Sequence, residues 1–226
     1  MLLTALYMYL SGSEKLDFTT IPGLNYGWIF LCAVWIILAI GMLLRLIPNQ
    51  RIAVGARKHY ACSYHAALSS GSGISDEQEM RKRLHKGALA SAIAWIVLNA
   101  VVLVIFSLTG MLTPAVVVII MLFFAVCDIV CILFYCPFQA LFMRNRCCAV
   151  CRIHNWDYIM MCTPLIAIPS VFSYSLLLLS IAVIVYWEIA LHKNPRYFME
   201  ETNVNLSCEQ CGDKLCRLHS GEYRHN

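Results

Sequence analysis

The stretch that decides the fold is residues 87–127, GALASAIAWIVLNAVVLVIFSLTGMLTPAVVVIIMLFFAVC, which contains no charged residue. It is far longer than the run of about 20 apolar residues that one membrane-spanning helix requires. Gly110 and Pro114 divide it near the middle, at residue types that end and start helices. The stretch therefore predicts two membrane-spanning helices, 87–108 and 114–136, joined by a tight hairpin.

The composition of the whole chain indicates the same class of protein. Of its 226 residues, 60% are hydrophobic and only 13% are charged, and the mean hydropathy is +0.69. Soluble domains carry about 25% charged residues. A chain this poor in charge could not cover a surface that faces water, so we predict an all-α integral membrane protein.

A further charge-poor run predicts the first span, 26–46. Tyr26 and Trp28 stand at one end of this run and Arg45 at the other, as expected for residues at the two membrane interfaces. The residues before it, 1–25, are expected to form an interfacial segment. With the hairpin helices and a last span that ends near residue 191, the predicted total is four transmembrane helices.

The last run, 158–191, allows two shapes. As one straight helix it would reach about 45 Å, against a hydrocarbon core of about 30 Å. Pro164 and Pro169 each remove a helical hydrogen bond in its first third. Either a long helix is kinked and tilted, or a re-entrant segment, 158–170, enters the membrane and returns before the fourth span.

Loop charges predict the orientation in a cell membrane. Basic residues gather in two loops, 47–86 and 137–157, and are nearly absent from the amino-terminal segment and the hairpin. These loop residues are Arg51, Arg57, Lys58, Arg81, Lys82, Arg83, Lys86, Arg144, Arg146 and Arg152. The positive-inside rule then places both loops in the cytoplasm and the amino terminus outside. Lys193 and Arg196 favour a cytoplasmic tail, 192–226.

The first loop predicts a helix and a contact with lipid. Residues 76–86 have acidic side chains in the first turn and Glu–Arg pairs four residues apart, a pattern typical of a helix. We expect this helix to continue into the second span. The basic and aromatic segment 51–68 is either a membrane-surface helix that binds anionic lipid or an ordinary positively charged loop. The bilayer is the expected partner; no nucleic-acid partner is expected, and a protein partner is not indicated.

The tail contains the most specific cysteine pattern of the chain, which has twelve cysteines. Cys208 and Cys211 form C-x-x-C-G in CEQCGDKLC, residues 208–216. A tight turn of this kind can bring two thiolates to one metal ion, and the glycine after the second cysteine permits the turn. The pattern resembles one knuckle of zinc-ribbon and rubredoxin-type sites, a likeness of site geometry that covers only these residues.

A closed structural zinc site requires four ligands. The loop 137–157, which is the third loop of the chain, offers a second pair. We predict a Cys-rich cytoplasmic cap with zinc as the cofactor and an iron–sulfur cluster as the alternative; unliganded thiols also stay open. The predicted metal ligands are Cys148, Cys151, Cys208 and Cys211, with Cys147, His154 and Cys216 as alternates. Such a site requires the tail and the loop 137–157 to share one membrane face.

Asp128 is the one acidic residue in the interior of a predicted span, since Glu188 lies where the last span ends. A carboxylate in the membrane costs a few kcal/mol, so it usually faces the interior of the helix bundle. Trp95 is expected at about the same depth and Asn99 about one turn away, while Cys127 and Cys131 share one face of the third span. Asp128 is therefore either part of a proton or cation relay or a buried group that holds helices together.

These features predict a polytopic membrane protein of accessory, assembly or transport type, non-enzymatic, with a structural metal cap. No catalytic motif of the hydrolase, zinc-protease or P-loop kind is present in the sequence. Two alternatives stay open. One is a membrane redox protein with an iron–sulfur or dithiol centre, and the other is a small ion or metal transporter that uses Asp128.

Overall fold

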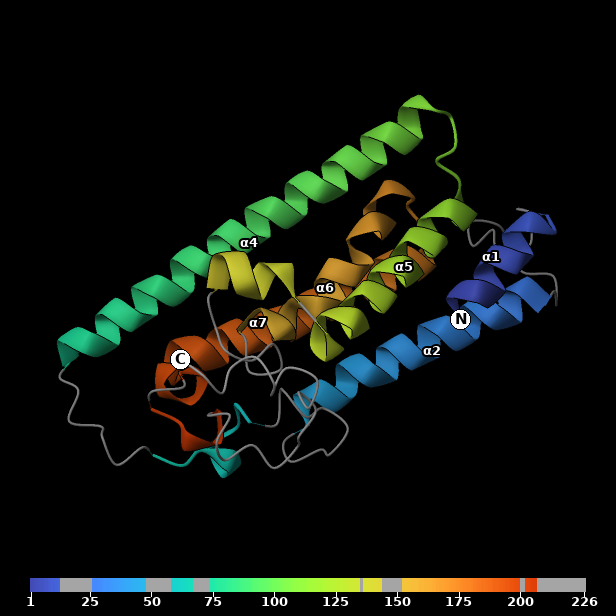
Figure 1. Cartoon of the computed structure of the whole chain (residues 1–226). Helices are drawn as coiled ribbons and strands as arrows, with labels where there is room; N and C mark the ends of the chain where they lie inside the picture. The colour runs from blue at the N-terminus through green and yellow to red at the C-terminus, as the bar shows by residue number, and fades with distance from the viewer. Residues whose placement is uncertain are drawn as a thin grey trace. The chain divides into compact units, whose positions relative to one another are not determined.

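A computed structural model of the chain describes residues 1–12, 26–47, 58–66, 74–134, 136–143, 152–199 and 202–206. None of these residues belongs to a strand. Four helices are long and apolar enough to cross a membrane (Figure 1): α2 (Tyr26–Leu46), α4 (Ile74–Leu108), α5 (Pro114–Leu133) and α7 (Val171–Lys193). For the described residues, the prediction of an all-helical fold with four such helices is confirmed.

The hairpin between α4 and α5 follows from its residue types. Gly110 has a φ of +69°, the left-handed conformation that glycine adopts at helix ends. The N–H of Gly110 donates to Ser107 O at 3.1 Å and that of Met111 to Phe106 O at 3.0 Å, which is a Schellman motif. Thr113 then caps α5, since its Oγ1 accepts a hydrogen bond from Val116 N at 3.4 Å.

Proline residues set two of the helix boundaries, and a third helix combines two predicted elements. α5 ends at Leu133 and not at residue 136, because Pro137 disfavours helical backbone in the residue before it. α4 begins at Ile74, so one helix contains both the predicted helix 76–86 and the second span. α7 begins after Pro169, where Ser170 Oγ accepts a hydrogen bond from Ser173 N at 3.1 Å.

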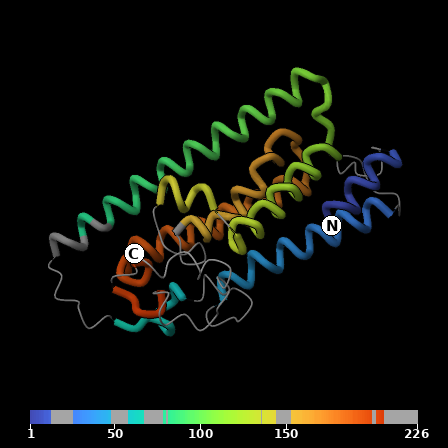
Figure 2. Tube along the Cα trace, viewed as in Figure 1, coloured from blue at the N-terminus to red at the C-terminus, as the bar shows by residue number. Residues whose placement is uncertain are grey.

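The segment before α7 forms short helices. α6 (Asp157–Cys162) continues into the 3₁₀ helix η6 (Thr163–Ala167), and Ile168 is extended. The chain reverses direction between η6 and α7 (Figure 2). The run 158–191 is therefore not one long helix.

The chain divides into two compact units, and each takes part of every long helix. Unit 1 is Met1–Leu43, Ala94–Asp128 and Asp157–Ile184, and unit 2 is Leu44–Ile93, Ile129–Trp156 and Val185–Asn226. In unit 1, one apolar cluster joins α5, α4 and the amino-terminal helix α1 (Leu2–Leu10). Its members are Val116, Ile120, Phe124, Trp95, Val102, Phe106 and Tyr9.

Many apolar side chains on the long helices face outward. On α4 these exposed residues are Leu89, Ile93, Ile96, Val97, Leu98, Val101, Val104, Ile105 and Leu108. Soluble monomers rarely expose a contiguous apolar surface of more than a few hundred Å². The outward faces are thus suited to lipid contact.

Unit 2 contains the amino-terminal half of α4, the end of α7 and several short turns. Ala88 on α4 packs with Ile153 on the 3₁₀ helix η5 (Arg152–Trp156), and Met143 on the π-helix η3 (Gln139–Met143) adjoins them. Three further 3₁₀ turns complete the unit: η2 (Ala61–Ser63), η7 (Pro195–Phe198) and η8 (Val204–Leu206). This unit holds the candidate site.

Candidate functional site

The predicted cysteine ligands lie outside the described residues. These are Cys147, Cys148, Cys151, Cys208, Cys211 and Cys216. Among the residues that the structure does describe, no group of three or more His, Cys, Asp or Glu side chains is placed to hold a metal ion. Zinc and the iron–sulfur alternative therefore stay predictions.

His154, an alternate ligand, is described and lies in η5. Its backbone oxygen accepts a hydrogen bond from Arg45 Nη1 at 2.8 Å. Burial lowers the pKa of His154 well below its ordinary value, and the charges of Arg45 and His59 lower it further. The imidazole is therefore neutral at neutral pH, the form in which histidine binds a metal.

The predicted polar residues of the membrane spans lie on α4 and α5. Asn99 is buried and its amide nitrogen donates to Trp95 O at 3.0 Å, while Asn99 Oδ1 has no hydrogen-bond partner among the described residues. The Trp95 ring meets Phe124 edge to face, at a centroid distance of 4.7 Å. Cys127, Asp128 and Cys131 are half-buried on α5. Their proposed roles stay predictions.

An unexpected site forms where the first loop meets the start of the tail. Asn203 is fully buried (0% exposed), and its Nδ2 donates to Lys58 O at 3.2 Å and to Tyr197 O at 3.0 Å. A single β-bridge pairs Ala66 with Asn203, and Val204 N donates to His65 O at 2.9 Å. The segments 58–66 and 202–206 are thus bound to each other by backbone and side-chain hydrogen bonds.

An aromatic cluster fills the space behind this contact. His59 is 2% exposed, stacks on Phe198 at 4.6 Å and meets the edge of Trp187 at 6.2 Å. Tyr60 meets Trp187 at 5.1 Å, and Tyr60 Oη donates to Arg45 O at 2.7 Å. Burial raises the pKa of Tyr60 above its ordinary value, and Tyr186 adds to the rise.

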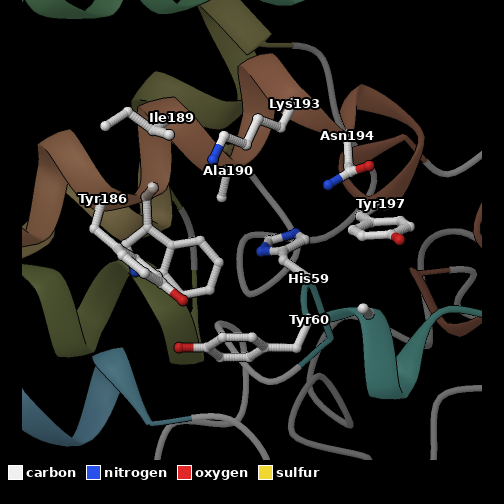
Figure 3. Close-up of a pocket in the computed structure, with 10 residues that line it drawn as sticks. His59, Tyr60, Tyr186, Ile189, Ala190, Lys193, Asn194 and Tyr197 are labelled. Atoms are coloured by element: carbon white, nitrogen blue, oxygen red, sulfur yellow. The ribbon is translucent and has the colours of Figure 1, made fainter.

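A pocket of about 290 Å³ opens beside the cluster (Figure 3). It is lined by His59, Tyr60, Ala61, Tyr186, Trp187, Ile189, Ala190, Lys193, Asn194 and Tyr197. In Figure 3, Ile189 and Tyr186 lie on one side of His59, and Asn194 and Tyr197 lie on the other. The Trp187 indole N–H is buried and has no acceptor among the described residues.

Two side chains of the third loop contact the residues of this site and of α7. Asn155 Nδ2 lies 3.5 Å from His59 Nδ1. Trp156 Nε1 donates to Glu188 Oε1 at 2.9 Å. Residues just after Cys151 and residues on α7 are therefore neighbours within unit 2.

Sequence reasoning missed this site. The segment 51–68 was predicted to be a lipid-binding helix or an ordinary loop, and its described part, 58–66, contains a short 3₁₀ turn between extended residues. Tyr186, Trp187 and the segment that contains Tyr197 carried only the signal of residues near a membrane interface. No periodicity links His59 with Trp187, so only the fold brings them together.

Comparisons with protein-family models, with curated proteins and with solved structures find no match to this chain.

Proposed function

We propose that the chain is a non-enzymatic, multi-pass membrane protein of accessory, assembly or transport type. Its amino terminus lies outside, its basic loops and tail lie in the cytoplasm, and a cysteine-ligated zinc ion stabilises the cytoplasmic cap. The four long helices with outward apolar side chains support membrane insertion. The basic loops support the orientation.

The observation that carries this proposal is the hydrogen bond between Trp156 and Glu188. The chain leaves the third loop at Trp156 and returns at Glu188, where Glu188 Oε1 lies 2.9 Å from Trp156 Nε1. A segment whose two ends meet cannot be a simple crossing of the bilayer. α6, η6 and α7 then form a re-entrant hairpin, and the tail emerges on the face from which the hairpin entered.

This arrangement favours the zinc cap. Cys148 and Cys151 precede η5 in the chain, and Cys208 and Cys211 follow η8. Both turns belong to unit 2. η5 adjoins the segment 58–66 through Asn155 and His59, and η8 adjoins it through Val204 and His65. The two cysteine pairs therefore continue from segments that the same part of the fold holds.

Elemental analysis of the purified protein tests the proposal. We expect about one zinc ion per chain, as one closed tetrahedral site requires, and its loss in both Cys208→Ser and Cys148→Ser. Cys62→Ser is the matched control, because Cys62 is exposed in the described part of the first loop. Iron with visible absorption near 400 nm would favour the redox alternative, and a metal-free wild-type protein would overturn the cap.

A further inference from the structure

The residues that line the pocket beside His59 carry positive charge and no negative charge. Lys193 is the only residue with a full charge among the ten that line it, and no Asp or Glu is among them. The other polar lining groups are hydroxyl, imidazole, indole and amide groups, which are types that can donate hydrogen bonds, although the Tyr60 hydroxyl already donates to Arg45 O. A pocket of this kind favours an anion over a cation.

The pocket lining is apolar in part and polar in part. Ile189 is 50% exposed and Tyr186 is 40% exposed, which leaves an apolar edge open to the surroundings. Lys193 and Asn194 are exposed at the end of α7, and the Lys193 ammonium lies near Ala190 on the Ile189 side of the pocket (Figure 3). His59 and Trp187 form the buried aromatic floor. An occupant that fits this lining has an apolar body and a negatively charged end.

The position of the pocket along α7 fits the head-group layer of a bilayer. The Cα atom of Lys193 lies about 9 Å beyond Trp187 along the helix axis. Its side chain points back along α7 toward Ala190, which brings the ammonium closer to the level of Trp187 (Figure 3). The polar layer on each side of a hydrocarbon core is about 5–8 Å thick. Exposed aromatic residues, such as the neighbouring Tyr186, are enriched at the boundary between the two. This step rests on the proposed membrane placement.

We propose that this pocket binds the head group of an anionic phospholipid. The phosphate lies against the Lys193 ammonium, with the Asn194 amide as a further donor, and the acyl chains leave past Ile189 and Tyr186. The volume of about 290 Å³ suits a head group and not a whole lipid. The aromatic rings would also attract the quaternary ammonium of a choline lipid, but Lys193 repels that cation.

Lipid retention measured by native mass spectrometry tests this proposal. Wild-type protein is released from nanodiscs made of equal parts phosphatidylglycerol and phosphatidylcholine. We expect it to retain one phosphatidylglycerol molecule in preference to phosphatidylcholine. In Lys193→Gln the preference should fall about tenfold, the typical effect of losing one charge-assisted hydrogen bond.

Two variants control for charge and folding. Lys82→Gln removes an exposed charge from α4 in the same unit but outside the pocket, and it should leave the preference unchanged. Lys193→Arg should retain the preference. Equal retention of both lipids by the wild type would overturn the proposal, as would an unchanged preference in Lys193→Gln. If soluble glycerol 3-phosphate bound as tightly as the lipid, the lipid assignment would fail.

The same preparations separate this proposal from the proposed function. Zinc content and resistance to carbonate extraction are measured beside lipid retention. Loss of lipid selectivity with zinc and membrane retention intact would overturn only the lipid site. Release of the wild-type chain by carbonate would instead overturn the membrane placement itself.

Discussion

The Asn203 side chain touches three separate stretches of backbone. Its Nδ2 donates to Lys58 O and Tyr197 O, and its Oδ1 accepts from His65 N at 3.4 Å and Asn205 N at 3.2 Å. The residue is fully buried, so water cannot replace these bonds. One amide thus holds the first loop, η7 and the start of the tail together.

Asn203→Ala should therefore destabilise unit 2. A buried carbonyl or N–H group left without a partner costs about 1–3 kcal/mol, and single substitutions rarely cost more than about 4 kcal/mol in total. We therefore expect a loss of about 2–4 kcal/mol in unfolding free energy. Hydrogen exchange of residues 58–66 should accelerate in the same variant. Asn194→Ala, at an exposed position on the same stretch of chain, is the control, and equal exchange rates in the two variants would contradict this role.

Tyr60 gives the fold a sensitivity to alkaline pH. Burial raises its pKa in the folded state, so the neutral phenol is favoured there. Its contribution to stability is then complete below the unfolded pKa of about 10 and is lost as the pH rises above that value.

Tyr60→Phe should flatten the alkaline end of the stability profile. Thermal unfolding of the two proteins between pH 8 and pH 11.5 measures this. At neutral pH the variant should be less stable by about 1 kcal/mol, because the hydrogen bond to Arg45 O is lost. An equally steep alkaline decline in both proteins would show that Tyr60 does not titrate with unfolding.

At the scale of elements, Gly41 on α2 lies directly against α6. A Cβ atom added at Gly41 would overlap the hydroxyl of Tyr158, and the Tyr158 Cζ atom would lie 3.1 Å from it. The overlap involves the end of a rigid ring and not a flexible chain. The close approach of α2 and α6 therefore requires glycine at this position.

A double-mutant cycle tests this packing. Gly41→Ala should destabilise the protein by about 1–3 kcal/mol, the usual cost of overpacking, despite the better helix propensity of alanine. Adding Tyr158→Phe removes the overlapping hydroxyl and should recover much of that loss, which appears as a coupling energy. Strictly additive effects in denaturant unfolding would mean that the two residues do not meet.

The sequence predicted those elements whose ends carry a local signal. Pro114 marks the start of α5, and Gly110 marks the turn before it. Pro164 and Pro169 left two shapes open for the run 158–191, because proline shows where a helix is disturbed and not in which direction the chain continues. The contact between the first loop and the start of the tail was not predictable, since Asn203 binds backbone groups that are far away in the sequence.

For the whole molecule, the parity of membrane crossings decides which face the tail occupies. An external amino terminus and three crossings through α2, α4 and α5 leave the third loop inside. A fourth simple crossing would put the tail outside, away from that loop. The proposed return of the last segment to its own side is compatible with the contacts of Asn203 with the first loop and of Trp156 with Glu188.

Thiol labelling with a membrane-impermeant reagent tests this topology in sealed cells and in opened membranes. Three single-cysteine variants are compared, retaining Cys62, retaining Cys216, or carrying Thr109→Cys at the exposed hairpin, with all other cysteines replaced by serine. We expect Thr109→Cys to react in sealed cells, and Cys62 and Cys216 to react only after the membrane is opened. Reaction of Cys216 in sealed cells would place the tail outside. The cysteine pairs of the third loop and the tail could then not bind one ion, and Asn203 could not contact the first loop.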